Sequence, residues 1–251
     1  MTRVLVVPAA GLGTRLGASR PKPLVEVNGQ PMLLRLLQLF SPFVERAVVV
    51  VHPSFAAAVR SRASAAAVPV ELAPQAEPTG MLDAILAAAP AARVRAAERV
   101  WIVWCDQIAL RRPTLEALSA AEAPAAAAPG LIVPTARVLT PYIHLQRDAA
   151  GQVTEVLQRR EGDVLPEDGE NDVGLFSLSR DAFAEELPAY ARRPPAGRLT
   201  GERNFLPFLS WMAARRGLGT LPVALPIEAL GVNTPAELAR VEAELAAREA
   251  E

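Results

Sequence analysis

The sequence is poor in the residues that form disulfides, metal clusters and membrane spans. Of its 251 residues only Cys105 is a cysteine and two are histidines, which excludes an internal disulfide framework and a cysteine-rich zinc site. It has no run of about 18 apolar residues, and its apolar beginning is too short for a secretory signal. These absences predict a cytoplasmic protein in a reducing compartment.

Net charge is also nearly absent. The chain has 26 basic and 27 acidic residues, and its basic pairs are scattered along the sequence. Such a chain has no electrostatic field for collecting nucleic acid or anionic lipid, so neither partner is expected. Hydrophobic residues make up 51% and charged residues 21%, a composition typical of a globular protein with a substantial buried core.

Apolar segments alternate with helical patterns in the first half of the chain. Strands that are apolar at every position belong to sheets covered on both faces, and alternation with helices gives parallel pairing. We therefore expect an α/β fold, Rossmann-like and doubly wound, with a mostly parallel mixed sheet and helices on both faces. The predicted strands are Val4–Pro8, Ala47–His52, Val68–Leu72 and Val100–Cys105, and the predicted helices are Met32–Phe40, Phe55–Ala66, Met81–Ala89 and Pro113–Ala121.

Beyond Gly130 short strands follow one another across turns, which predicts a β-hairpin extension of the sheet. The chain ends in a helix with Thr234 as N-cap and Glu237 completing a capping box, and its apolar stripe is expected to pack on the domain. We expect residues 1–251 to form a single domain. The strands predicted here are Leu131–Pro134, Ile143–Arg147, Val153–Gln158 and Val173–Leu178.

A glycine-rich loop follows the first predicted strand. Gly11 and Gly13 let the backbone approach a ligand closely, and Arg15 and Lys22 add two cations that suit a triphosphate. The dinucleotide fingerprint does not fit, because the third glycine, Gly17, comes one place late. A Walker loop does not fit either, because no Gly-Lys-Ser/Thr sequence is present.

The spacing G-x-G-T-R-x6-K resembles the sugar-1-phosphate nucleotidyltransferases, a family of NTP transferases. It resembles in particular the uridylyltransferase domain of N-acetylglucosamine-1-phosphate uridylyltransferases, without the acetyltransferase β-helix, because hexapeptide repeats are absent. The resemblance implies that Arg15 and Lys22 are catalytic. It also implies nucleotide-binding roles for four residues of the loop, which are Ala10, Gly11, Gly13 and Thr14.

Two further segments resemble parts of the family's site that hold the base and the metal. Gln75 and Gly80 resemble the stretch that grips the pyrimidine base in the uridylyltransferase branch, which implies a preference for UTP. Asp106 follows the strand Val100–Cys105, and Asn233 lies in a Gly-Val-Asn segment; the resemblance implies that both bind Mg²⁺, which prefers oxygen ligands. Cys105 stands where the family usually has glycine.

Candidate sugar-phosphate contacts follow from the same resemblance, with two departures from the family pattern. Gln158 stands where the family usually has glutamate, and Asp172, two residues before Gly174, stands in place of an asparagine. Glu202 belongs to a third pocket segment. Because both departures fall at positions that contact ribose and sugar hydroxyls in the family, the identity of the sugar stays open.

The resemblance implies a single nucleotidyltransferase domain over residues 1–251, with a nucleotide-binding half (1–122) and a sugar-phosphate-binding half with the C-terminal helix (123–251). It also implies Mg²⁺-dependent transfer of a nucleotidyl group from an NTP to a sugar 1-phosphate, either GlcNAc-1-phosphate or glucose-1-phosphate, giving an NDP-sugar and pyrophosphate. Two alternatives remain. One is cytidylyl transfer to phosphocholine or a similar phospho-alcohol. The other is a catalytically silent regulatory protein that binds sugar nucleotides. The sequence leaves the oligomeric state and the pathway open.

Overall fold

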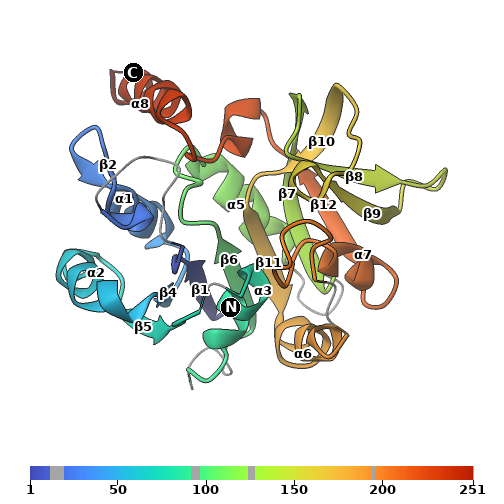
Figure 1. Ribbon diagram of the computed structural model, residues 1–251, viewed down its shortest axis with the longest axis horizontal. Helices are drawn as coiled ribbons and strands as arrows, with labels where there is room; N and C mark the ends of the chain where they lie inside the picture. The colour runs from blue at the N-terminus through green and yellow to red at the C-terminus, as the bar shows by residue number, and fades with distance from the viewer. Residues whose placement is uncertain (12–19, 78, 92–96, 124–127, 194–195, 251) are drawn as a thin grey trace.

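The computed structural model describes residues 1–11, 20–77, 79–91, 97–123, 128–193 and 196–250. Within these residues an eight-stranded sheet has the order β10-β7-β11-β6-β1-β4-β5, and β12 pairs with β7. Figure 1 shows the sheet running across the molecule from β5 to β10. The strands are β1 (Arg3–Pro8), β4 (Arg46–Val51), β5 (Val70–Pro74), β6 (Arg99–Val103), β7 (Leu131–Leu139), β10 (Asp168–Asp172), β11 (Leu175–Ser179) and β12 (Leu218–Pro222).

The sheet is mixed and mostly parallel. Strands β5, β4, β1 and β6 pair in parallel, as do β12 and β7, whereas β11 is antiparallel to both of its neighbours and β10 is antiparallel to β7. Two small ribbons lie outside the sheet. They are β2 (Glu26–Val27) with β3 (Gln30–Pro31) and the hairpin of β8 (Ile143–Arg147) with β9 (Val153–Gln158).

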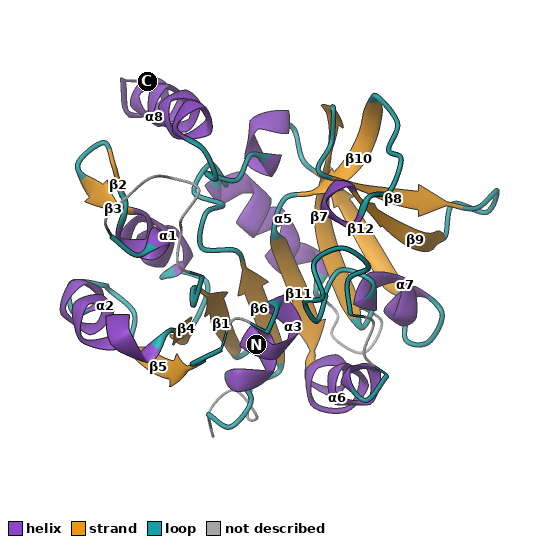
Figure 2. Cartoon of the chain, viewed as in Figure 1, coloured by secondary structure: helices purple, strands orange, loops and turns teal. Residues whose placement is uncertain are grey.

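Helices cover both faces of the sheet (Figure 2). Alternate residues of β1 separate into two buried clusters: Leu5 and Val7 in one, Val4 and Val6 in the other. The first cluster is covered by α1 (Met32–Phe40), α2 (Ala56–Ala63), α5 (Arg112–Ala121) and α8 (Pro235–Ala250). The second is covered by α3 (Met81–Ala87), α6 (Leu187–Ala191), α7 (Phe208–Ala213) and the β8–β9 hairpin.

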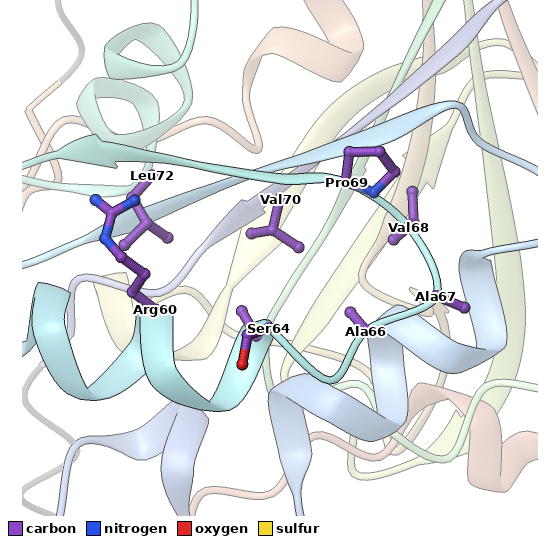
Figure 3. A pocket seen from close by; sticks show the side chains of 9 residues that line it. Arg60, Ser64, Ala66, Ala67, Val68, Pro69, Val70 and Leu72 are labelled. Carbon is purple, nitrogen blue, oxygen red and sulfur yellow. The ribbon is translucent and has the colours of Figure 1, made fainter.

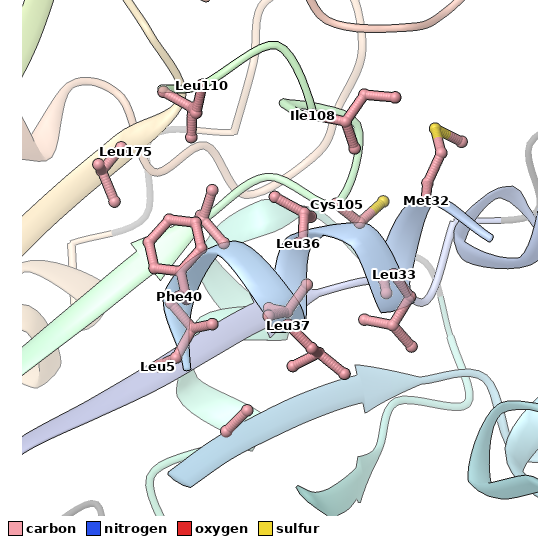
Figure 4. Packing of buried hydrophobic residues seen from close by; sticks show 14 of the residues in the cluster. Leu5, Met32, Leu33, Leu36, Leu37, Phe40, Cys105, Ile108, Leu110 and Leu175 are labelled. Carbon is pink, nitrogen blue, oxygen red and sulfur yellow. The ribbon is translucent and has the colours of Figure 1, made fainter. Parts of the chain in front are cut away.

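Helix α1 shows how the apolar periodicity forms the core. Leu33, Leu36, Leu37 and Phe40 recur at helical spacing and are fully or almost fully buried. Figure 4 shows these side chains between the sheet and the segment that carries Cys105 and continues to Ile108 and Leu110. This packing holds the segment that follows β6 in place, and it thereby positions Asp106, the residue after Cys105.

The structure confirms the predicted fold class, including the hairpin extension, and the predicted bounds of α1 and β8 agree with it. The N-terminal capping box of α8 is also confirmed, because the N–H of Glu237 donates to Thr234 Oγ1 at 3.2 Å. Val241 and Leu245 pack in the first cluster, as expected. Among the described residues, no helix is both long and apolar enough to cross a membrane.

Two strands of the sheet were not predicted. Strand β10 has the sequence Asp-Gly-Glu-Asn-Asp, which has no apolar residue, and it owes its extended form to pairing with β7 along the sheet. Strand β12 is only partly buried and pairs with β7 in parallel. Both strands are stabilised by a distant neighbour and not by their own hydrophobic pattern.

Candidate active site

The predicted site residues come together because parallel strands end at a common edge of the sheet. The segment Ala9–Gly11 follows β1, Gln75 follows β5, and Asp106 follows β6. Backbone bonds extend the ladder past the strands: the Ala9 N–H donates to Val50 O at 2.8 Å and the Gln75 N–H to Val51 O at 2.9 Å. In open α/β sheets this edge is where ligands bind.

The antiparallel strand β11 brings a further segment to the same edge, because its first residue lies beside the end of β6. The Trp104 N–H donates to the carbonyl of Gly174 at 2.9 Å. Asp172, at the end of β10, accepts a hydrogen bond from the Gly174 N–H at 2.6 Å. The predicted sugar-pocket residues Asp172 and Gly174 therefore lie next to the loop that carries Asp106.

At the centre of this edge Lys22 joins Asp106 and Asn233. Its ammonium lies 2.5 Å from Asp106 Oδ2 and 2.8 Å from Asn233 Oδ1, although the partners are 84 and 211 positions away in sequence. The Lys22 and Asp106 side chains are only 15% and 13% exposed. One catalytic candidate and both metal-ligand candidates thus form a single cluster of one cation and two side-chain oxygens.

Backbone contacts hold Asp106 and Asn233 side by side. The Val232 N–H donates to the carbonyl of Asp106 at 3.2 Å. Gly231 is suited to this contact, because a Cβ there would lie 3.2 Å from Asp106 Oδ2. Upstream, the buried carboxylate of Glu228 accepts hydrogen bonds from the Arg111 N–H and the Thr114 hydroxyl, which ties the segment before Asn233 to the start of α5.

The start of α8 fixes Asn233 from the other side. The carboxylate of Glu237 accepts the Asn233 N–H at 2.9 Å and the Thr234 hydroxyl at 3.1 Å, and its other oxygen accepts the Tyr142 hydroxyl at 2.6 Å. Burial raises the pKa of Glu237, but these hydrogen bonds outweigh it and hold the pKa below its usual value. Glu237 therefore stays ionised around neutral pH.

Two oxygens directed at one cation are the feature that a magnesium site requires. Asp106 and Asn233 offer one carboxylate and one amide oxygen, and Mg²⁺ commonly takes one or two protein oxygens with waters and substrate phosphates for the rest. Within the described part of the chain, no group of three or more His, Cys, Asp or Glu residues could hold a metal ion. The donor set therefore fits Mg²⁺ and not a zinc site.

The neighbouring Cys105 has no nucleophilic role in this arrangement. Its side chain is buried against α1, as Figure 4 shows, and burial raises the pKa of the thiol to about 12. A thiol with that pKa is protonated at neutral pH and inert. Cys105 thus belongs to the buried cluster that α1 covers.

The predicted base-binding loop is held by a distant segment. Gln75 Nε2 donates to the carbonyl of Gly80 at 3.3 Å, so the two base-binding candidates contact each other. Gly80 has a φ of +131°, and a Cβ there would lie 2.5 Å from the backbone nitrogen of Arg203. The Arg203 N–H donates to Thr79 O at 2.8 Å and its carbonyl accepts the Leu82 N–H at 3.1 Å.

The three sugar-pocket segments meet only in part. Asn204 Nδ2 donates to Gln158 Oε1 at 2.5 Å. This bond joins the last residue of β9 to the segment that contains Glu202. Glu202 itself pairs with Arg160 at 2.7 Å, and its side chain is 41% exposed. The structure therefore brings Asn204, and not Glu202, to Gln158.

Asp172 and Gln107 are two buried polar residues that flank Gly174. Burial raises the pKa of Asp172 to about 6; the Gly174 N–H bond opposes this shift and the charge of Asp106 adds to it. Next to Gly174, the side chain of Gln107 is buried, and its Oε1 accepts no hydrogen bond from any described residue. Two buried acceptors at this position suit a ligand that donates hydrogen bonds.

Part of the predicted phosphate loop lies outside the described residues. Gly13, Thr14 and Arg15 fall in residues 12–19, so their positions are not described. Of the loop's other nucleotide-binding candidates, Ala10 is buried and Gly11 is exposed, with open space where a Cβ would lie.

A hollow of about 470 Å³ lies elsewhere, between α2 and β5 (Figure 3). In Figure 3, Arg60 of α2 and Ser64, which follows the helix, lie opposite Val70 and Leu72 of β5. Gln75 follows the end of that strand. The hollow does not include the residues at the carboxyl edge, and its lining lacks the convergent polar groups of a substrate site.

Sequence reasoning missed five residues that support the site. The residues are Tyr142, Arg203, Asn204, Glu228 and Glu237. Glu237 had a sequence signal, the capping box, but that signal indicates a helix start and not a contact with Asn233. Arg203 and Asn204 lie in the predicted pocket segment, but the prediction named Glu202 as its contact. Tyr142 and Glu228 act through partners far away in sequence, and no local pattern predicts such contacts.

The chain is similar in sequence to known proteins. Residues 5–172 match the sequence profile of the MobA-like NTP transferase domain. The bifunctional protein GlmU of Anaeromyxobacter sp. (strain K) is 32% identical over 254 residues, which cover 98% of this chain and 50% of the relative. GlmU of Alkalilimnicola ehrlichii is also 32% identical, over 98% of this chain and 51% of the relative. The chain thus spans about half the length of these curated relatives.

A solved structure shares the fold. The crystal structure of HddC from Yersinia pseudotuberculosis superimposes with a TM-score of 0.68, covering 98% of this chain and all of the HddC chain. Its sequence identity is 18%. At that identity the similarity shows a common fold, with the mixed sheet and flanking helices described above.

Proposed function

We propose a specific reaction for this chain, which belongs to the family of MobA-like NTP transferase domains. Membership makes the chain a nucleotidyltransferase. We propose that it transfers a nucleotidyl group, with Mg²⁺, from UTP to a sugar 1-phosphate such as GlcNAc-1-phosphate or glucose-1-phosphate. The products would be an NDP-sugar and pyrophosphate.

One observation carries the proposal: the Lys22 ammonium contacts both Asp106 Oδ2 and Asn233 Oδ1 at the carboxyl edge of the sheet. Lys22 follows β1, Asp106 follows β6, and Asn233 lies just before α8. Their convergence supports a site for a phosphate ligand and its metal ion, because it joins a cation with two oxygens of the kind Mg²⁺ prefers.

The chemistry needs no general base. A phosphate oxygen of the sugar 1-phosphate, already anionic, attacks the α-phosphorus of the nucleotide in line, and the bond to pyrophosphate breaks on the opposite side. In this proposal Lys22 and Arg15 neutralise the charge that develops on the phosphate oxygens. Asp106 and Asn233 would hold Mg²⁺, which when bound polarises the phosphates and orients them.

The remaining site residues would select the substrates. Gln75 and Gly80 present an amide and a backbone group for a pyrimidine, and the Gln158–Asn204 pair with Asp172 offers polar contacts for sugar hydroxyls. We also propose that residues 1–251 form one domain. In support, both buried clusters combine side chains from residues 1–122 with side chains from residues 123–251.

The decisive experiment is a matrix of nucleoside triphosphates against phosphorylated acceptors, read as pyrophosphate release with and without Mg²⁺. We expect release with UTP and a sugar 1-phosphate, and only when Mg²⁺ is present. Release with CTP and phosphocholine alone would favour cytidylyl transfer to a phospho-alcohol. Binding of a UDP-sugar with no release from any pair would favour a silent regulatory protein.

A further inference from the structure

The Lys22 ammonium is bonded to both of the oxygens that the proposed metal site would use. It lies 2.5 Å from Asp106 Oδ2 and 2.8 Å from Asn233 Oδ1, and among the described residues these are its only hydrogen-bond partners. A magnesium ion would bind the same two oxygens at the usual distance of about 2.1 Å, so they cannot keep their bonds to the ammonium at the same time. Lysine and metal therefore compete for these oxygens.

Charge strengthens this competition. Asp106 is largely buried, and the Lys22 ammonium is its ion-pair partner at 2.5 Å. Without Lys22 the Asp106 charge would be poorly compensated in a partly buried site. A divalent ion beside the ammonium would repel it, so the cation is either the lysine or the metal.

We propose that Lys22 is an internal cation that competes with the metal for Asp106 and Asn233, and that the metal displaces Lys22 toward the phosphates of the nucleotide. This inference rests on the proposed metal site and adds the coupling between the metal and the lysine. The lysine that leaves Asp106 needs a new anionic partner, and a bound triphosphate supplies one. Metal and nucleotide therefore favour each other's binding, and the metal alone binds weakly.

Removal of the Lys22 ammonium should strengthen metal binding. Lys22→Met removes the ammonium but keeps an unbranched side chain, so it should tighten metal binding while it removes a group needed for turnover. Titration with Mn²⁺ in the absence of nucleotide, followed by the loss of the free-ion electron paramagnetic resonance signal, measures this directly. We expect a Kd at least about 10-fold lower than in the wild type, a factor that corresponds to about 1.4 kcal/mol.

Arg20→Met is the matched control. Arg20 lies two residues before Lys22 on the same segment, is exposed, and pairs with Glu26 at 3.3 Å. Its replacement removes the same charge from the same region without vacating the two oxygens. We expect its Mn²⁺ affinity to stay within about 2-fold of the wild type, because screening weakens exposed charges that are not in contact.

Thermal unfolding gives a second readout that also reports on folding. Lys22→Met should unfold at a lower temperature than the wild type in EDTA and should gain more in melting temperature when Mn²⁺ is added. Lys22→Gln provides a polar alternative in case the methionine variant does not fold. If Lys22→Met and Lys22→Gln both fold and bind Mn²⁺ no more tightly than the wild type, the proposal is overturned. It is also overturned if Arg20→Met gains as much Mn²⁺ affinity as Lys22→Met.

A third variant separates this inference from the proposed function. Adding Asp106→Asn to Lys22→Met should cancel the gain in Mn²⁺ affinity, because the carboxylate is then missing. If Asp106→Asn weakens binding but Lys22→Met does not tighten it, the metal site stands and the competition does not. If Asp106→Asn has no effect on Mn²⁺ binding in either background, the proposed metal site itself is wrong.

Discussion

The backbone N–H of Asn233 donates to the carboxylate of Glu237, one helical turn further along α8, at 2.9 Å. The same carboxylate caps the helix through Thr234 and accepts the hydroxyl of Tyr142. Asn233 is therefore fixed by the first turn of α8 and by the segment that leads into β8. A side chain that only caps a helix in the sequence also orients a candidate metal ligand in the structure.

Glu237→Ala should weaken metal binding through Asn233. Groups that orient metal ligands typically contribute about 10- to 100-fold in metal affinity, and we expect a loss in this range for Mn²⁺. Glu237→Gln, which can still accept hydrogen bonds, should recover part of the loss. The control is Glu244→Ala on the same helix, where the carboxylate pairs with Arg248. If Glu237 only stabilises the helix, both variants should have a lower melting temperature and the same Mn²⁺ affinity as each other, which would contradict this prediction.

Lys22→Ala should lower kcat by at least about 100-fold, the usual loss when a preorganised donor is removed from a charged transition state. Arg15→Lys should also be damaging, because a point charge does not reproduce a bidentate phosphate contact. Steady-state pyrophosphate release measures both effects, with Arg20→Ala as the control that should retain turnover. Turnover close to wild type in Lys22→Ala would remove Lys22 from the catalytic machinery.

Gln75→Ala should raise KM for UTP more than it changes kcat, and it should narrow the difference between UTP and the other nucleotides. The amide of Gln75 lies against Gly80, and loss of a matched polar contact costs about 1–3 kcal/mol, or roughly 10- to 100-fold in selectivity. Gln38→Ala, at an exposed position of α1, is the control. Equal use of ATP, GTP and UTP by the wild-type protein would show that this loop does not select the base.

Asp172→Asn should make the protein more stable above pH 6. Burial raises the pKa of Asp172 in the folded state to about 6, above its ordinary value of 3.8, so folding favours the protonated form. The folded protein then binds more protons than the unfolded chain between these values, and the unfolding free energy contributed by this group falls as pH rises. The asparagine lacks this dependence, and its amide oxygen still accepts the Gly174 N–H.

Chemical denaturation of both proteins at pH 4 and pH 8 tests this sign. A shift of about two pKa units corresponds to roughly 3 kcal/mol, so the variant should gain up to that amount over the wild type at pH 8 and little at pH 4. A stability difference that does not change with pH would show that Asp172 ionises in the folded protein as it does in the unfolded chain.

The sequence by itself determined the fold class and the starts and ends of several elements. The continuous apolar runs of β1, β4 and β6 predicted a covered parallel sheet, because strands buried on both faces need no polar alternation. The periodic leucines of α1 predicted that helix with the correct bounds. The linear motif from Gly11 to Lys22 predicted a nucleotidyltransferase, and family membership confirms it.

The tertiary structure decided the contacts between these motifs. Only folding brings Lys22 to Asn233, 211 positions away. Only folding also places the backbone of Arg203 so close to Gly80 that a side chain has no room there. The same is true of β10, whose residues are all polar or glycine and which is a strand because β7 supplies its hydrogen-bond partners. Hydrophobic periodicity reports only on neighbours within a turn or a strand, whereas these contacts depend on where separate elements meet in the packed protein.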